Sequence, residues 1–312
     1  MVKLLLALKT FLKFDLSKKA WQWTVLFTLA LVWGSSFILM KKGLRSFEFG
    51  QVAALRVFFG FLVLAPLFLR KIKKLNRKNI IHIIISGYAG IFFPAFLFAK
   101  AQTEINSSLA GMINSLAPFF ALIFGVLLYK NKPGKYQVLG ILLGLVGAIG
   151  LISDGNIFES FGTINGYALY VVLATFGYGI NANQIRFKLR DFNGVEITIL
   201  SFLFIGPPAG IYLLFSDFSM LTTSPTWAID LSFIFMLSFL GSVIALFFFN
   251  SLVQYTSALF ATSVTYIIPF FAIIWGVFDD EKITIVQVAS IMIALFGVWL
   301  VNKKKKPKIE TN

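Results

Sequence analysis

The chain has 312 residues, of which 58% are hydrophobic and 13% are charged. In a soluble domain, roughly a quarter of the residues are charged. This composition therefore excludes a soluble enzyme, a disordered chain and a domain that binds DNA or RNA. The net charge of +15 is instead typical of cationic loops on the cytoplasmic side of a membrane. With no cysteine and one histidine, the sequence predicts no disulfide, no metal site and no cofactor.

Two basic segments flank the apolar part of the chain. Residues 1–20 carry five lysines among short apolar clusters, and no uncharged run there is long enough for a signal-peptide core. We expect this segment to lie along the cytoplasmic surface of the membrane. Residues 303–312 form a second basic segment, which is predicted to be a cytoplasmic tail.

The hydropathy pattern predicts an all-α polytopic membrane protein. A spanning helix needs about 20 mostly apolar residues. Ten stretches meet this condition: 21–40, 49–69, 79–99, 105–129, 136–153, 161–185, 193–216, 229–254, 257–278 and 283–301.

The charges alternate between successive connections of these ten spans. Most of the 28 lysines and arginines fall in the two termini and in every second loop, while most acids fall in the other loops. Because basic loops stay on the cytoplasmic side, both termini are predicted to be cytoplasmic. The chain is therefore predicted to be a multi-pass protein of the cytoplasmic (inner) membrane, with the lipid bilayer as its surroundings.

The two halves of the chain contain similar sequences. The stretch Pro-Phe-Phe-Ala-x-Ile-x-Gly-Val occurs at Pro118 and again at Pro269, 151 residues later, and Gly90 matches Gly241 at the same offset. The predicted repeats are residues 21–153 and 154–302. Since each repeat holds five helices, the second must be inverted in the membrane. Inverted repeats place a binding site near the middle of the membrane and permit alternating access.

Several motifs resemble those of one family of carriers. They are Leu31-Val32-Trp33-Gly34-Ser35-Ser36-Phe37, Leu55-Arg56-Val57-Phe58, the prolines of the fourth and ninth spans, Gly140-x3-Gly144-x2-Gly147 and Ala294-x2-Gly297. With these motifs, residues 21–302 resemble the ten-helix EamA-type branch of the drug/metabolite transporter superfamily. The resemblance implies a carrier that moves amino acids or other small metabolites, usually outward.

Polar and aromatic side chains near the middle of the spans are the candidates for lining a substrate cavity. Uncharged hydrogen-bonding groups beside aromatic rings suit a neutral or zwitterionic small-molecule substrate, although the same groups also form hydrogen bonds between helices. The candidates are Trp33, Ser36, Asn114, Ser115, Thr175, Tyr178, Ser242, Thr265 and Tyr266.

Two charged residues are predicted inside spans. Arg56 could bind an anionic substrate group, or it could be satisfied structurally by carbonyls or a carboxylate. The structural role is favoured because the family resemblance includes this arginine whatever the substrate. Glu196 could couple transport to protons or sodium, but its position at a predicted helix start favours interaction with the helix dipole.

Three prolines, Pro94, Pro118 and Pro269, are predicted to break helical hydrogen bonds near the middle of the membrane. They could act as hinges, or they could be packing kinks.

The function predicted from the sequence is export of small metabolites by alternating access, either uncoupled or proton-coupled. The alternatives are a lipid flippase or scramblase and a nucleoside or sugar carrier of the same superfamily. An enzyme is not expected, because paired acids or an activated nucleophile are lacking in the spans. The small residues of the fifth and tenth spans predict close helix packing, and a homodimer face is the alternative use for them.

Overall fold

The computed structural model describes residues 15–105, 107–153, 166–271 and 285–301, and the regular secondary structure in these ranges is helical. Residues 1–14 of the basic segment, residue 154 at the predicted start of the second repeat, and the tail 303–312 lie outside the described residues.

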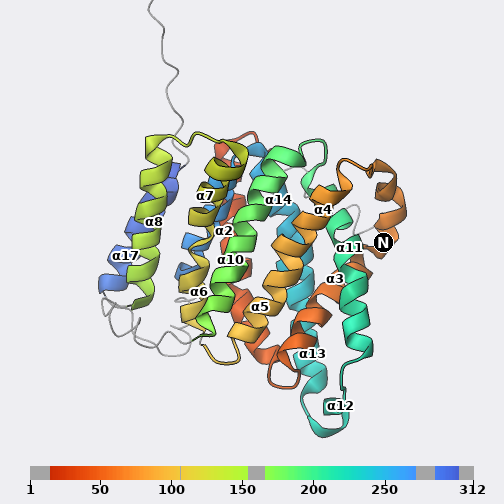
Figure 1. The fold of residues 1–312 in the computed structure, drawn as a ribbon. Coiled ribbons are helices and arrows are strands. Elements are labelled where there is room, and N and C mark those ends of the chain that lie inside the picture. The colour runs from red at the N-terminus through yellow and green to blue at the C-terminus, as the bar shows by residue number, and fades with distance from the viewer. Residues whose placement is uncertain (1–14, 106, 154–165, 272–284, 302–312) are drawn as a thin grey trace, which may run out of the picture.

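The helices of the first half run side by side in Figure 1. They are α2 (Lys19–Gly43), α3 (Phe49–Lys71), the 3-10 turn η1 (Ile72–Lys74), α4 (Ile80–Gly87), the π-helical turn η2 (Tyr88–Phe92), α5 (Phe93–Ala101), α6 (Ser107–Asn114), α7 (Ala117–Tyr129) and α8 (Lys135–Ser153).

The described part of the second half is also helical. Its elements are α10 (Ala168–Lys188), α11 (Gly194–Leu214), α12 (Met220–Thr223), α13 (Trp227–Met236), the π-helical turn η3 (Leu237–Ile244), α14 (Ala245–Tyr255), α15 (Ala258–Thr262), the 3-10 turn η4 (Ser263–Tyr266) and α17 (Ile285–Val301), with residues 268–271 again helical.

Several of these helices have the length and composition of membrane spans. Within the described ranges, 5 continuous helical stretches are long and apolar enough to cross a bilayer. They are Lys19–Gly43, Phe49–Lys74, Ile80–Ala101, Gly194–Leu214 and Trp227–Tyr255, and shorter apolar helices cover Ala117–Tyr129, Lys135–Gly147, Ala258–Phe271 and Val288–Val301. The prediction of an all-helical, polytopic membrane protein is confirmed.

Local sequence signals set the helix ends. The side chain of Asn193 accepts from the backbone N–H of Glu196, and Glu196 accepts in return from the backbone of Asn193, which forms a capping box at the start of α11. Glu48 and Gln51 form a similar box at the start of α3. α7 ends at Tyr129, and the next residue, Lys130, adopts a left-handed conformation with φ of 51°.

The helices pack in three main groupings. α3 lies along α11, and α10 packs between α5 and α7. α8 and α17 form an antiparallel pair at the left of Figure 1. In this pair, a Cβ atom at Gly147 would lie 2.5 Å from the backbone nitrogen of Ala294, so the two backbones are in direct contact.

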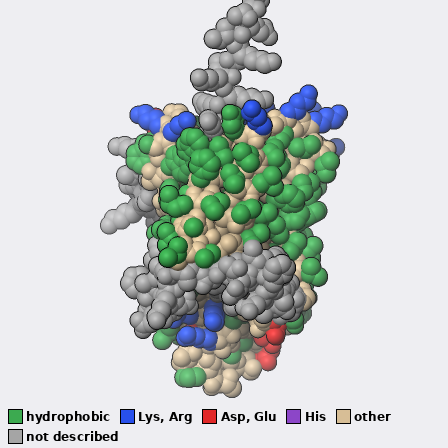
Figure 2. Space-filling view, turned by 90° about the vertical axis from the view of Figure 1, so that its left-hand side faces the viewer, with side chains coloured by type: hydrophobic (Ala, Val, Ile, Leu, Met, Phe, Trp, Pro, Cys, Tyr) green, Lys and Arg blue, Asp and Glu red, His purple; other side chains and the backbone are tan. Residues whose placement is uncertain are grey.

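The outer face of the α8 and α17 pair is a belt of apolar side chains, with lysines and arginines above it (Figure 2). Ile285, Val146 and Met292 are each more than half exposed on this face. Such a large exposed apolar surface is unusual for a soluble monomer. It is the surface that a bilayer covers.

The two halves share irregularities at equivalent positions. The π-helical turns η2 and η3 interrupt two long helices. When residues 88–92 of η2 are shifted by the repeat offset of 151, they correspond to residues that lie within η3. The predicted fourth span is divided between α6 and α7, and the predicted ninth span changes to a 3-10 turn at η4. Both interruptions lie just before the matching prolines, Pro118 and Pro269.

Candidate transport cavity

A cavity of about 100 Å³ lies between the two halves. This volume is well above the roughly 10–15 Å³ that a single water molecule needs, so the cavity has room for several. Its lining is Trp33, Ser36, Phe37, Met40, Arg56, Gly90, Ile91, Ala95, Phe98, Asn114, Ala117, Tyr178, Asn181, Gly241, Ser242, Leu246, Phe249, Thr262, Val264, Thr265 and Ile268.

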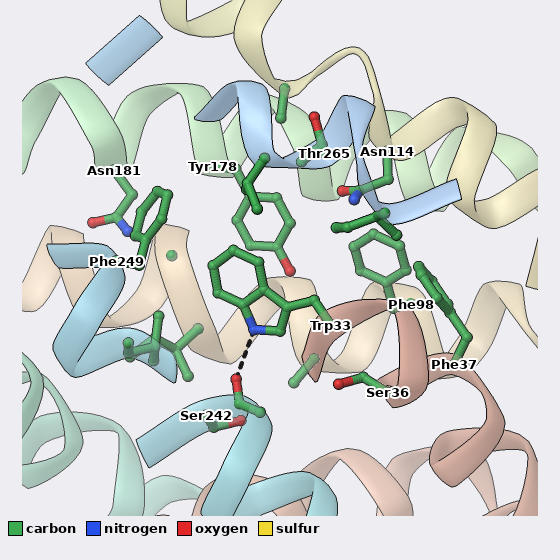
Figure 3. A pocket seen from close by; sticks show the side chains of 18 of the residues that line it. Trp33, Ser36, Phe37, Phe98, Asn114, Tyr178, Asn181, Ser242, Phe249 and Thr265 are labelled. Atoms are coloured by element: carbon green, nitrogen blue, oxygen red, sulfur yellow. Dashed lines mark hydrogen bonds between the residues drawn. The ribbon is translucent and has the colours of Figure 1, made fainter. Parts of the chain in front are cut away.

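The π-helical turn η3 supplies backbone polarity to the cavity wall. The N–H of Ala245 bonds to the carbonyl of Leu240, five residues back, and so bypasses the carbonyl of Gly241. The indole Nε1 of Trp33 donates to that carbonyl at 2.8 Å (Figure 3). Carbonyls released from helical bonding are tolerated in a membrane where they line a cavity, and π-helical turns often mark functional sites.

Arg56 of α3 reaches the cavity beside the same turn. Its Nε donates to the hydroxyl of Ser242 at 2.8 Å, and its backbone carbonyl accepts from the hydroxyl of Ser238 at 2.6 Å. Both serines belong to η3. These bonds fix the guanidinium at the wall where α3 meets η3.

Asn114 lies across the cavity from Ser242. In Figure 3, Asn114 and Thr265 lie on one side of Trp33 and Tyr178, and Ser242 lies on the other. Asn114 is the last residue of α6, where the helix breaks before α7. Its side chain is 5% exposed, and within the described part of the chain its Oδ1 has no hydrogen-bond donor. A buried acceptor without a donor is costly, so it is positioned to receive one from a ligand.

Aromatic rings form much of the remaining wall. Trp33 contacts Phe249 at a ring distance of 5.4 Å, and Phe98 packs between Phe37 and Tyr178 at 6.1 Å and 6.0 Å. The cavity therefore combines apolar faces with a few polar groups, as ligand pockets commonly do.

The structure places seven of the predicted lining residues around this one cavity. They are Trp33, Ser36, Arg56, Asn114, Tyr178, Ser242 and Thr265. For Ser36, the hydroxyl donates to the carbonyl of Val32 at 2.9 Å, which is a bond within its own helix.

The other three predicted residues are not among the lining residues of this cavity. The hydroxyl of Thr175 donates to Val172 in its own helix, and that of Ser115 donates to the carbonyls of Gly111 and Thr265. The Tyr266 hydroxyl donates to the carbonyl of Ile141 in α8 at 2.9 Å. Each hydroxyl is used in helix packing, and none of the three residues reaches the cavity.

The sequence reasoning missed apolar lining residues that a periodicity signal could have found. Phe37 and Met40 follow Trp33 and Ser36 at positions i, i+3, i+4 and i+7, which share one face of a helix. Asn181 also lines the cavity, where its Oδ1 accepts from the hydroxyl of Ser86 at 2.6 Å.

Each of the three prolines lies beside an irregularity of a helix. Pro118 lies in the first turn of α7, where the missing N–H costs little. Pro94 lies directly after the π-helical turn η2, inside the continuous helical stretch Ile80–Ala101. Pro269 follows the turn at Ile267, where a helix resumes. The prolines therefore coincide with interruptions of the helices beside the cavity. A role as moving hinges stays a prediction.

Glu196 is 3% exposed, and it is not one of the residues that line the cavity. Its Oε1 accepts from the ammonium groups of Lys71 at 2.9 Å and Lys74 at 2.8 Å. Together with the capping box, these bonds join the start of α11 to the end of α3. This geometry supports a structural role at the helix start.

We expect Glu196→Gln to leave the pH dependence of transport unchanged. Glutamine retains the capping box but loses the ion pairs to two partly exposed lysines, a loss of about 1 kcal/mol or less. Glu196→Ala also loses the cap and should cost about 1 kcal/mol more. Thermal unfolding and flux with and without a pH gradient measure both effects. Loss of gradient-driven flux in the glutamine variant, at normal stability, would restore the coupling role.

The cavity lining is paired across the two halves. Six lining residues of the first half each have a lining partner 151 positions later. The pairs are Gly90 and Gly241, Ile91 and Ser242, Ala95 and Leu246, Phe98 and Phe249, Asn114 and Thr265, and Ala117 and Ile268. Ser115 and Tyr266 also correspond at this offset, and neither lines the cavity.

A polytopic helical membrane protein with a central cavity built from both halves has the architecture of a membrane carrier. The sequence profile of the EamA-like transporter family matches residues 20–153 and 165–303, so the chain belongs to the EamA-like transporter family. The protein is therefore a multi-pass membrane transporter. Family membership indicates a transporter rather than an enzyme.

Known relatives agree with this assignment. The chain is 26% identical over 290 residues to the "Uncharacterized inner membrane transporter YedA" of Escherichia coli strain K12, covering 90% of each chain. It is 24% identical over 289 residues to an "Uncharacterized transporter" of Archaeoglobus fulgidus, covering 91% of this chain and 99% of that one. A solved structure, titled only as the crystal structure of a protein, shares the fold with a TM-score of 0.68 at 16% identity, covering 91% of this chain and 96% of the other.

Proposed function

We propose that the protein carries small neutral or zwitterionic metabolites, amino acids among them, outward across the cytoplasmic membrane. The composition of the cavity supports this proposal. Its described lining combines aromatic rings, hydroxyl and amide groups and one arginine, without an acid. A cavity without an acidic group favours uncoupled transport and is unsuited to organic cations.

We also propose that ten membrane-spanning helices form two inverted five-helix repeats, with both termini in the cytoplasm. The observation that carries the proposal is the pairing of cavity residues at one fixed offset, Asn114 with Thr265 above all. The two separate matches to one family profile agree with it. Alternating access follows naturally from such a design, because exchanging the conformations of the two repeats exposes the cavity to the opposite side.

Reconstitution into proteoliposomes tests the function. We expect saturable flux of one or more labelled amino acids without a pH gradient. Asn114→Ala should reduce this flux about three- to tenfold, because it removes a hydrogen-bonding group from the cavity. The matched control is Ser115→Ala, whose hydroxyl bonds only to helix carbonyls and whose flux should stay near that of the wild type.

Three results would contradict the proposal. Equal flux in the wild type and Asn114→Ala would remove Asn114 from the substrate path. Flux of nucleosides or sugars in place of amino acids would redefine the substrate. Movement of labelled lipid without amino-acid flux would favour the flippase or scramblase alternative.

A further inference from the structure

Arg56 differs from Lys18, Lys71 and Lys74, the described basic residues that form ion pairs, because no described carboxylate pairs with it. Arg56 is the charged residue of the described cavity lining. The bonds that its guanidinium and carbonyl make go to hydroxyl groups, those of Ser242 and Ser238. Hydroxyl groups orient the guanidinium but do not neutralise it.

Within the described ranges, no ion pair includes Arg56. The ion pairs found there join Asp15 to Lys18, and Glu196 to Lys71 and Lys74. Asp230, which is buried in the first turn of α13, accepts from the hydroxyls of Ser46 and Thr226. A charge inside a membrane protein is costly unless it is paired or hydrated. An anionic group of a ligand would therefore stabilise the guanidinium of Arg56.

The opposite side of the cavity offers complementary chemistry. The buried Oδ1 of Asn114 is an acceptor without a described donor. Trp33 and Tyr178 lie between Asn114 and Ser242 (Figure 3), and their ring faces attract cationic groups. A ligand that is negative at one end and donates hydrogen bonds at the other would satisfy both sides at once.

We propose that Arg56, held by Ser242, is the subsite that binds a substrate carboxylate, and that Asn114 accepts a hydrogen bond from a donor group at the opposite end of the substrate. This inference rests on the proposed function and narrows it. The transported compounds carry a carboxylate, and amines, sugars and nucleosides without one are rejected. The planar guanidinium suits carboxylate geometry better than an ammonium group does, which makes Arg56 the residue that determines specificity.

Two matched pairs of compounds isolate the carboxylate. Leucine and leucinamide both carry an amino group, and the second has an amide where the first has a carboxylate. 4-Methylpentanoate and 4-methylpentanamide show the same exchange in molecules that have no amino group. Competition with leucine flux, and the ligand-induced rise of the unfolding temperature of purified protein, are measured for all four compounds.

For the wild type, we expect the carboxylates to bind about 10- to 100-fold more tightly than their amides, the range expected for a charged hydrogen-bonded contact. In Arg56→Gln this preference should fall below about threefold, and Arg56→Lys should restore part of it. These changes in selectivity are not expected of an arginine that only stabilises the fold.

The outcomes separate the inference from the proposed function. Flux of leucine and leucinamide with equal affinity would overturn the inference and leave the transport function standing. Binding of carboxylates that requires Arg56, without any flux, would support the inference and overturn transport of these compounds. A preference for carboxylates that survives in folded Arg56→Gln protein would overturn the assignment of Arg56, as would the absence of carboxylate binding to the wild type.

Discussion

Replacing Tyr266 with alanine is expected to lower the free energy of unfolding by about 3 to 5 kcal/mol, the range for removing a large buried ring. Tyr266 is 1% exposed. Its ring packs against Gly144 of α8, where a Cβ atom would lie 2.3 Å from the ring, and its hydroxyl bonds to the carbonyl of Ile141. The side chain thus joins the interrupted ninth span to α8.

Tyr266→Phe is the matched control. It keeps the ring and loses one hydrogen bond, so its cost should be about 1 kcal/mol, and transport by the folded protein should continue. Thermal unfolding in detergent and flux per folded molecule measure the two effects. If Tyr266→Phe abolished flux at an unchanged unfolding temperature, Tyr266 would be a substrate ligand after all, as its sequence position predicts.

Gly297→Ala is expected to destabilise the protein by about 1 to 3 kcal/mol, the usual cost of overpacking. A Cβ atom at Gly297 would lie 2.6 Å from both the carbonyl oxygen of Gly140 and the nitrogen of Gly144. Both neighbours are backbone atoms, which cannot turn away as a side chain can. The added methyl group must therefore push α8 and α17 apart.

Gly111→Ala is the control, because its expected effect on stability is the opposite of that of Gly297→Ala. Among the described residues, no atom lies within 4 Å of a Cβ atom placed at Gly111. Since alanine favours a helix over glycine by up to about 1 kcal/mol, this change should be neutral or stabilising. Equal unfolding temperatures for the two variants would show that the backbones of α8 and α17 are farther apart than described.

The Pro-Phe-Phe-Ala repeat allowed the correspondence between Asn114 and Thr265 to be predicted from sequence. The same offset pairs Ser115 with Tyr266, and sequence reasoning assigned all four residues to the cavity. The structure brings the first pair to the cavity and directs the second pair into helix packing. Adjacent residues on a helix point about 100° apart, and here Asn114 and Thr265 are the members of the two pairs that are turned toward the cavity.

Span length, the alternation of charged loops and the repeated motifs determined the class of protein from the sequence alone, because lipid requires long apolar helices and leaves basic groups at the ends. The rotation of each helix was decided only by the tertiary structure. Helices that are apolar on every side carry no hydrophobic face to orient them. Contacts such as Trp33 with Gly241 and Arg56 with Ser242 therefore arise from the packing of distant segments around η3, whose π-helical turn sets the positions of those partners.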